Sequence, residues 1–214
     1  MKLVVTGALG HIGSRLIRDL PAAFPGSELV LLDDLRTQRY CSLFDLPRLN
    51  GKYRFIELDV SRNDIRKHVE GADALVHLAA ITNAAASFEN RDLVEQVNFA
   101  ATASAAEACC ATGVPMVFPS STSVYGSQAS RVDENCSREE LKPQSPYAET
   151  KLREEDALAE LGRSRGLRFV IFRFGTIAGV SPGMRFHTAV NKFCWQAAMG
   201  EPITVWRTAY DQKR

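Results

Sequence analysis

The sequence predicts a doubly wound α/β fold, in which helices cover both faces of one parallel β-sheet. Short apolar runs alternate along the chain with longer segments of helical composition, and this alternation is typical of parallel strands joined by right-handed crossovers. The apolar runs lack a regular polar alternation, which indicates strands that are buried on both faces. A glycine-rich turn lies between the first apolar run and the first helical segment, as in many folds of this class.

The predicted strands follow the apolar runs in order. They cover residues 2–5, 28–33, 53–59, 73–80, 115–121 and 167–174. The first helix is expected over residues 11–20, where Pro21 should stop it because proline disrupts a helix interior. The second helix is expected between Ser61 as its cap and Gly71 as its end.

Two longer helices complete the pattern. An alanine-rich helix is predicted over residues 92–112 and should end at Gly113. The segment from residue 147 to about 162 is strongly helical in composition and follows the fifth strand. Both helices stand where crossovers between parallel strands are expected.

The bulk composition is typical of a soluble globular protein. The chain has 214 residues, of which 45% are hydrophobic and 24% charged, and this length suits one domain, or one domain and part of another. Lys and Arg total 26 against 25 for Asp and Glu, so the net charge is +1. That balance gives no electrostatic reason to expect a nucleic-acid or membrane-surface partner, and no apolar run is long enough to span a bilayer.

The cysteines indicate a reducing location. There are five of them and no C-x-x-C pair, so at least one thiol is unpaired. The chain starts directly with an apolar strand pattern, without a signal peptide, and no residue spacing suggests a metal site. We therefore expect a cytoplasmic protein without a metal.

The turn "TGALGHIG" carries glycines at positions 7, 10 and 13, between a strand and a helix. Gly7 permits the tight turn, Gly10 lets the backbone approach a pyrophosphate, and Gly13 lets helix and strand pack closely. The helix N-terminus offers free N–H groups and a partial positive charge to phosphates. In this context the motif predicts a dinucleotide site on a Rossmann-like domain.

Acidic residues at the ends of the next two strands fit the same site. Asp33 ends the second predicted strand, where a carboxylate can accept hydrogen bonds from the adenosine ribose. It would repel a 2′-phosphate and so favours NAD over NADP, although Arg36 and Arg39 leave NADP open. Asp59 ends the third predicted strand, where it can meet the adenine amine.

The stretch "SPYAETK" places Tyr147 and Lys151 four residues apart on one helix face. The pair is either an ordinary surface contact or a base activated by a nearby ammonium. Free tyrosine has a pKa of about 10, and lowering it by about 3 units requires roughly 4 kcal/mol of preference for the phenolate. The two residues alone leave both alternatives open.

Eight segments, in family order, resemble the extended short-chain dehydrogenase/reductase family, and within it the NAD-dependent epimerase/dehydratases that act on nucleotide sugars. The matching segments are "TGALGHIG", "LLDDL", "ELDV", "VHLAA", "VNFAAT", "SSTSVYG", "SPYAETK" and "FRFGTIAG". The resemblance implies that Ser121, Tyr147 and Lys151 are catalytic. Tyr147 would take a proton from a sugar hydroxyl while hydride leaves the same carbon for NAD, and Ser121 would orient that oxygen.

The resemblance also implies a set of residues that line the cofactor groove, with Thr122 and Thr176 on the substrate. The groove residues are Gly7, Gly10, His11, Ile12, Gly13, Asp33, Asp34, Asp59, Val60, Leu78, Ala79, Ala80, Thr82, Asn98, Tyr147 and Lys151. His77 ends a strand and is expected to be structural.

The residues after Ser121 narrow the reaction. Thr122 and Ser123 stand where dehydrating relatives carry an Asp-Glu pair and decarboxylating relatives a glutamate. Neither hydroxyl can act as a general acid or base near neutral pH. A 4-epimerase remains, with a 4-keto-reductase or dehydrogenase as the alternative. A non-catalytic NAD-binding module also stays open, and Thr176 departs from the asparagine that is common in the family.

Two domains are expected. Residues 1–174 should form the NAD-binding unit, and residues 175–214 the start of a smaller substrate-binding domain that is truncated after "EPITVW". Apolar side chains in this second segment should pack against the rest of such a domain and otherwise lie exposed: Phe193, Trp195, Ile203, Val205 and Trp206. Because relatives pair the helices over 92–112 and 147–162 across a two-fold axis, a homodimer is also expected.

Overall fold

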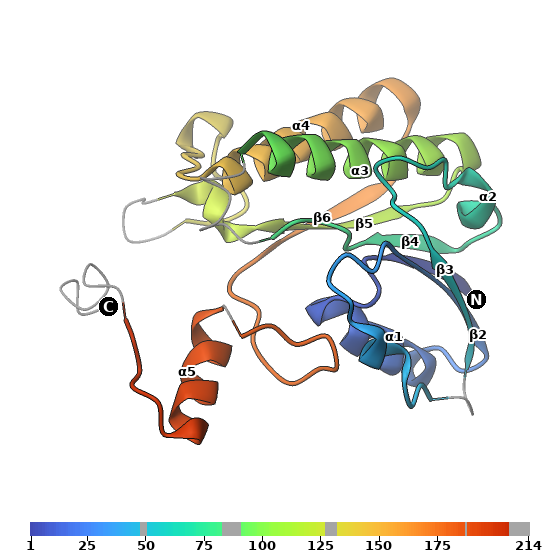
Figure 1. The fold of residues 1–214 in the computed structure, drawn as a ribbon. Coiled ribbons are helices and arrows are strands. Elements are labelled where there is room, and N and C mark those ends of the chain that lie inside the picture. Colours follow the sequence, from blue (N-terminus) through green and yellow to red (C-terminus); the bar gives the residue numbers. More distant parts are fainter. Residues whose placement is uncertain (48–50, 83–90, 127–131, 187, 206–214) are drawn as a thin grey trace.

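A computed structural model of the chain describes residues 1–47, 51–82, 91–126, 132–186 and 188–205. Six strands form one sheet in the order β3-β2-β1-β4-β5-β6, and all neighbouring strands are parallel. The strands are β1 (Lys2–Thr6), β2 (Ser27–Asp33), β3 (Gly51–Glu57), β4 (Ala74–His77), β5 (Met116–Ser121) and β6 (Phe169–Phe174). Figure 1 shows helices above and below this sheet, which confirms the predicted fold class.

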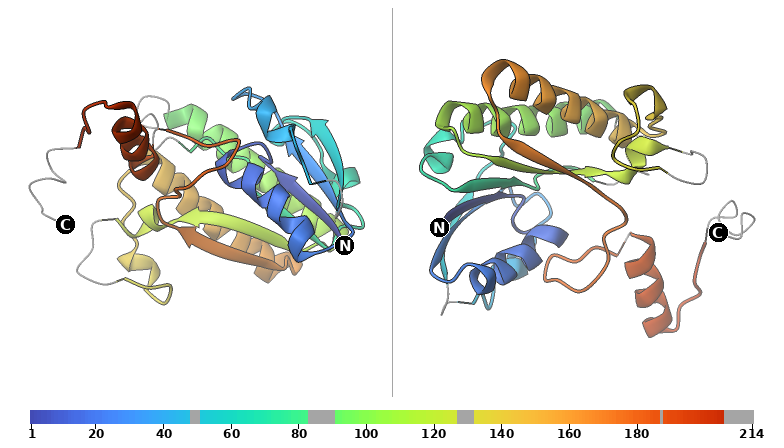
Figure 2. Two further views of the ribbon diagram at one scale, coloured as in Figure 1. Left: turned by 90° about the horizontal axis from the view of Figure 1, so that it is seen from below. Right: turned by 180° about the vertical axis from the view of Figure 1, so that it is seen from behind.

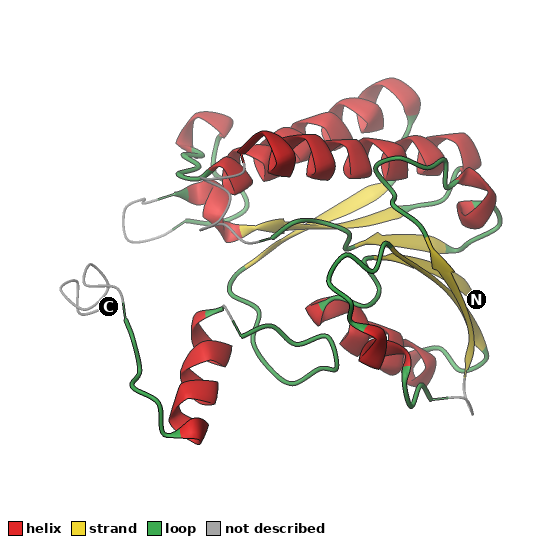
Figure 3. Cartoon of the chain, viewed as in Figure 1, coloured by secondary structure: helices red, strands yellow, loops and turns green. Residues whose placement is uncertain are grey.

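The described α-helices form two layers on the sheet, and a further helix follows near the C-terminus. They are α1 (His11–Ala23), α2 (Arg66–Val69), α3 (Arg91–Thr112), α4 (Pro146–Arg165) and α5 (Ala189–Met199). Helices α3 and α4 lie side by side over one face, and α1 lies under the other (Figures 1 and 3). Helix α5 covers neither face of the sheet, as Figure 1 and the right view of Figure 2 show. The described connections include the 3₁₀ turns η1 (Tyr40–Leu43), η3 (Thr122–Tyr125) and η4 (Arg138–Glu140).

Alternate side chains of the central strands fill two separate cores. Val4 of β1 packs with Phe118 and Leu158 in the core under α3 and α4. Its neighbour Val5 packs with Ile17 in the core over α1. The central strands are therefore buried on both faces, as their apolar runs predict.

The edge strand β6 departs from that prediction. Phe169 and Ile171 pack into the core under α3 and α4, but Val170 and Phe172, on the opposite face, are 42% and 47% exposed. The reason is that α1 packs on β1 and β2 and leaves the β6 end of its face uncovered.

Pro21 does not end the first helix, contrary to expectation, because α1 continues to Ala23. A proline within a helix leaves the carbonyl four residues earlier without its N–H partner. That carbonyl belongs to Ile17, and it accepts a hydrogen bond from the Tyr53 hydroxyl at 3.2 Å. The tertiary contact satisfies the group that the proline would otherwise leave unpaired.

The second predicted helix is also wrong in extent, since α2 covers only four residues. Ser61 does not cap it. Both the backbone N–H and the hydroxyl of Ser61 donate to Asp59, at 2.8 and 2.6 Å. These bonds favour a turn directly after β3. Gly71 does follow the helix, with a φ of 70°.

Among the residues that the structure describes, none of the helices has the length and apolar character needed to cross a bilayer.

Phe118→Ala tests the core under α3 and α4. The Phe118 side chain is fully buried, so we expect its truncation to lower the free energy of unfolding by about 3–5 kcal/mol. The matched control is Phe172→Ala on the neighbouring strand, which should lower it by about 1 kcal/mol or less because that ring is half exposed. Urea unfolding of both variants is the measurement, and equal losses would contradict this description of the core.

Candidate active site

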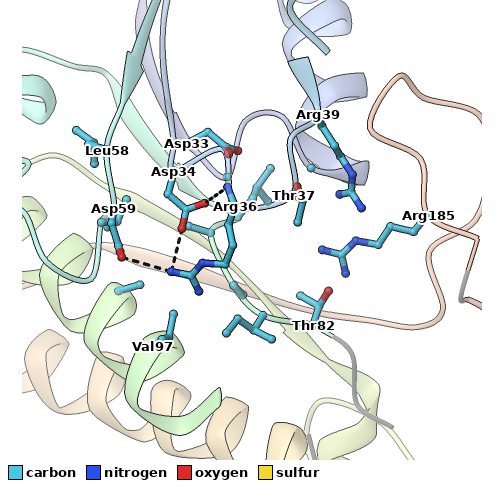
Figure 4. Close-up of a pocket in the computed structure, with 18 residues that line it drawn as sticks. Asp33, Asp34, Arg36, Thr37, Arg39, Leu58, Asp59, Thr82, Val97 and Arg185 are labelled. Atoms are coloured by element: carbon cyan, nitrogen blue, oxygen red, sulfur yellow. Dashed lines mark hydrogen bonds and ion pairs between the residues drawn. The ribbon is translucent and has the colours of Figure 1, made fainter. Parts of the chain in front are cut away.

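A groove runs along the edge of the sheet where the strands end at their carboxyl termini. It consists of two adjoining cavities. The first, drawn in Figure 4, lies beside the ends of β2 and β3. The second lies beside the ends of β5 and β6 and the start of α4. The residues that line both cavities, and so join them, are Gly7, Gly10, Leu78, Ala80, Thr82 and Arg185.

The glycine turn forms the floor where the two cavities meet. A Cβ on Gly7 would lie 2.6 Å from the backbone of Leu78 and Ala79, and its φ of 62° is left-handed. A Cβ on Gly13 would lie 2.5 Å from the Gly7 carbonyl oxygen. Both positions therefore require glycine. Helix α1 starts after Gly10 without any side-chain cap, so its first N–H groups remain available to an anion.

Asp33 occupies the end of β2 in the first cavity. One carboxylate oxygen accepts from the backbone N–H of Leu9 and the other from that of Leu35, both at 3.0 Å. Burial raises the pKa of Asp33 above its ordinary value, although these two hydrogen bonds act to lower it. The carboxylate is thus fixed in place and faces the groove.

Two further predicted carboxylates are engaged by an arginine. Arg36 lies 3.0 Å from Asp34 and 3.4 Å from Asp59 (Figure 4). The guanidinium therefore bridges the ends of β2 and β3 over the first cavity. Val60 lies beside Asp59 in the same wall.

The three predicted catalytic residues line the second cavity, together with His11, Ile12, Thr122 and Thr176. Ser145 caps α4 by accepting a hydrogen bond from the Ala148 N–H at 3.2 Å, which places Tyr147 in the first turn of the helix. Ser121 ends β5, with its hydroxyl 2.8 Å from that of Ser123. The carboxyl end of β5 and the N-terminus of α4 thus face the same space.

Lys151 is only 3% exposed, which excludes the alternative of a surface pair. Its ammonium lies 3.0 Å from a carboxylate oxygen of Glu154, 4.4 Å from the centre of the Phe118 ring and 6.0 Å from that of Tyr147. Burial acts to lower the pKa of Lys151, but the charges of Glu154, Tyr147 and Glu155 and the hydrogen bond to Glu154 together outweigh it, and the pKa is raised above its ordinary value. The lysine is therefore held as a cation beneath the tyrosine.

A buried chain of hydrogen bonds continues from this ion pair to β1. The other oxygen of Glu154 accepts from the Thr102 hydroxyl at 2.7 Å, and Thr102 lies 3.2 Å from Nε2 of His77. Nδ1 of His77 lies 2.8 Å from the Thr6 hydroxyl, which accepts from the N–H of Ala79 at 3.2 Å.

The hydrogen bonds in this series all run in one direction, with each donor facing toward Glu154. Since the Thr102 hydroxyl donates to Glu154, it must accept from His77, so the imidazole carries its proton on Nε2. Burial lowers the pKa of His77 to about 3, and the ring is neutral. These contacts support the structural role that was expected for His77, which also lines the second cavity.

Asn98 was expected in the groove, but it lines neither cavity. It is fully buried, and its amide pairs with both backbone groups of Ile81, at 2.7 and 2.9 Å. It thereby supports the segment that carries Ala80 and Thr82 into the groove wall.

The sequence prediction did not include two charged residues that shape the site. Glu154 has a weak signal in the sequence, a carboxylate three residues after Lys151 on the same helix face. Arg185 has none, because it reaches the groove through the tertiary position of the segment after β6.

The chain matches a known protein family and several known sequences. Residues 3–214 match the model of a family described as the NAD dependent epimerase/dehydratase family. A Bacillus subtilis protein described as an uncharacterized UDP-glucose epimerase is 33% identical over 96% of this chain and 65% of its own length. The UDP-glucose 4-epimerase of Azospirillum brasilense is 30% identical over 98% of this chain and 61% of its own.

A solved structure of a 4-epimerase is also similar to this chain. The UDP-glucuronic acid 4-epimerase of Bacillus cereus, in complex with UDP-glucuronic acid and NAD, superposes with a TM-score of 0.85 and 28% identity, over 96% of this chain and 66% of that one. The chain spans less than two thirds of the length of the curated relatives named above.

Glu154→Gln tests whether Glu154 keeps Lys151 charged. Without the carboxylate, the strongest influence that opposes burial is lost, so we expect the pKa of Lys151 to fall, while Tyr147 and Glu155 still act to raise it. NMR titration of the ¹³C-labelled lysine Cε, with Lys151→Met to assign the signal, is the measurement.

The matched control for this test is Glu155→Gln. Glu155 is the adjacent carboxylate and pairs with Arg173 at 2.7 Å. Glu155 has the smallest of the influences that raise the pKa of Lys151, so its replacement should lower that pKa less than Glu154→Gln does. An unchanged pKa of Lys151 in the Glu154→Gln variant would contradict the role of Glu154 in keeping the lysine charged.

Proposed function

The chain belongs to the NAD-dependent epimerase/dehydratase family, and on this basis we propose that it forms the cofactor-binding and catalytic part of a nucleotide-sugar 4-epimerase that uses NAD. One observation carries the proposal. A single groove holds a glycine turn and Asp33 in one part, and Ser121, Tyr147 and Lys151 in the other.

The described residues suit NAD along the length of this groove. Asp33 is positioned to accept hydrogen bonds from the adenosine ribose, and the uncapped start of α1 to meet the pyrophosphate. Asp33 would also repel a 2′-phosphate, and the ion pairs of Arg36 with Asp34 and Asp59 engage one of the two arginines that could offset this repulsion. NAD is therefore preferred to NADP.

The catalytic residues have separate tasks. NAD, when bound, supplies the hydride acceptor and donor. The Tyr147 phenolate oxygen takes the proton from the sugar hydroxyl at the reacting carbon and later gives it back. Lys151 favours the phenolate through its charge, which Glu154 maintains. Ser121 donates a hydrogen bond to the same sugar oxygen and orients it.

The second cavity supports a 4-epimerase over a dehydratase. Among the described residues that line it there is no aspartate, glutamate or cysteine. Removal of water from a sugar requires an additional acid and base, whereas transfer of hydride at one carbon requires only the Tyr147 proton. The same lining is compatible with a keto-reductase or dehydrogenase, which would exchange its cofactor with solution at each turnover.

The domain division is part of the proposal. Residues 1–174 supply the cofactor site, and residues 175–214 would contribute to the substrate side. Several apolar side chains in this second segment are exposed, namely Trp195, Val190, Ile203 and Val205. Trp206, also expected to be apolar surface, lies outside the described residues.

Tyr147→Phe tests the proposed chemistry. We expect turnover of UDP-glucose, UDP-glucuronic acid or UDP-N-acetylglucosamine to fall on the order of hundreds-fold or more, because only the transferable proton is removed. NAD binding should persist. Tyr40→Phe is the control, since that hydroxyl is exposed and outside both cavities.

The outcomes of this test separate the candidate functions. NAD retained through turnover supports the epimerase, and cofactor that exchanges freely supports the reductase. Near-normal turnover by Tyr147→Phe would exclude the catalytic assignment. NAD binding without turnover of any of the three sugars would favour a non-catalytic module.

We also propose that two copies of the chain associate through the outer faces of α3 and α4. The family resemblance motivates this, and Leu93 is an exposed apolar residue on α3. Sedimentation at micromolar concentration should give the mass of a dimer, and Leu93→Lys should shift it toward the monomer. A monomer in the unmodified chain would contradict the proposal.

A further inference from the structure

Two arginines from distant parts of the chain face the first cavity without an acidic partner. Arg39 follows β2 and Arg185 follows β6, and both line this cavity. Figure 4 shows their guanidinium groups on the same side of it. Arg36, in the same pocket, is ion-paired with two carboxylates, whereas no ion pair joins Arg39 or Arg185 to any described residue.

Both guanidinium groups carry donors that lack a partner. Nη1 of Arg39 and Nε of Arg185 are closed to solvent and make no hydrogen bond within the described chain. A buried donor without an acceptor is costly, more so when it is charged. The two cations also repel each other. Burial lowers the pKa of Arg185, and Arg39 lowers it further.

The backbone holds Arg185 in this position. The Ser181 hydroxyl donates to the carbonyl of His11, and the Gly183 N–H donates to the Ser14 hydroxyl, both at 2.9 Å. A Cβ on Gly183 would lie 2.3 Å from the Leu9 carbonyl oxygen, so the segment is in close contact with the glycine turn.

A further hydrogen bond fixes the end of this segment. The Arg185 carbonyl accepts from the Asn191 side chain at 2.8 Å. Arg185 is therefore carried over the start of α1, where it lines both cavities.

The loop that carries Arg39 is shaped by strained backbone. Leu35 and Gln38 have φ values of 53° and 51°, which is unusual for residues other than glycine. Such strain persists only where surrounding structure maintains it, and it concentrates at ligand sites. Leu35 is held by its hydrogen bond to Asp33.

We propose that Arg39 and Arg185 form a clamp for the pyrophosphate of the dinucleotide, opposite the N–H groups of the glycine turn. This inference rests on the proposed function, in which the groove holds NAD. Phosphate oxygens would accept hydrogen bonds from the unpartnered guanidinium donors and offset the repulsion between the two cations. The clamp joins the segment after β6 to cofactor binding, so the dinucleotide would hold that segment against the glycine turn.

Calorimetric titration of the full chain with NAD tests the clamp. Arg39→Gln and Arg185→Gln should each weaken NAD binding on the order of tenfold, because each removes a charged donor to phosphate. Binding of adenosine, which lacks the pyrophosphate, should change little. Arg15→Gln is the control for net charge, since Arg15 is exposed on α1 and paired with Asp19, and it should leave NAD affinity unchanged.

Titrations of the same variants with NAD, NADP and UDP distinguish the clamp from the proposed function. If the unmodified chain binds NAD and the two variants bind it equally well, the clamp is wrong and the proposed function stands. Losses confined to NADP would assign the arginines to a 2′-phosphate, and losses confined to UDP would assign them to the sugar nucleotide. Either result would overturn the clamp. Absence of NAD binding by the unmodified chain would overturn both proposals.

Discussion

The buried ion pair between Lys151 and Glu154 is the contact on which the arrangement of the second cavity depends. Two charges are removed from water there, which is costly unless each has partners that remain in place. Glu154 meets this condition through Thr102, and Lys151 through the Phe118 ring beneath it. Removing one member would leave an uncompensated charge in the core, which is far more destabilising than the pair itself is stabilising.

This pair also ties the layers of the fold together. Lys151 and Glu154 stand on α4, Thr102 on α3, His77 on β4 and Thr6 on β1. Each hydroxyl or ring donates to the next group toward Glu154, so a change of tautomer at His77 would break bonds on both sides of the ring. This series of hydrogen bonds also reaches the groove, because the Thr6 hydroxyl accepts a hydrogen bond from the N–H of Ala79 in the groove wall. Buried hydrogen bonds therefore connect the wall of the groove to the core.

The sequence was sufficient for the parts of the molecule governed by local patterns. Apolar runs predicted all six strands within a few residues, and the glycine spacing predicted the turn because Gly7 and Gly13 have no space for a Cβ. It was insufficient where a distant contact decides. Pro21 remains within α1 because Tyr53 satisfies Ile17, and Arg185 reaches the groove because residues 181–183 bind the start of α1. Neither contact leaves a periodic signal in the sequence.

The charges along the groove differ from one part to the next, and under the proposed function this difference would set the orientation of the bound dinucleotide. Asp33 presents oxygens that can accept hydrogen bonds from ribose hydroxyls but repel phosphate. Arg39, in the same cavity as Asp33, and Arg185, which lines both cavities, present unpartnered donors that can attract phosphate. The second cavity has no described carboxylate and holds the cation of Lys151 below Tyr147. A dinucleotide bound in reverse would lose its phosphate contacts or bring phosphate to Asp33, so the same residues that bind the cofactor would also determine which end reaches Tyr147.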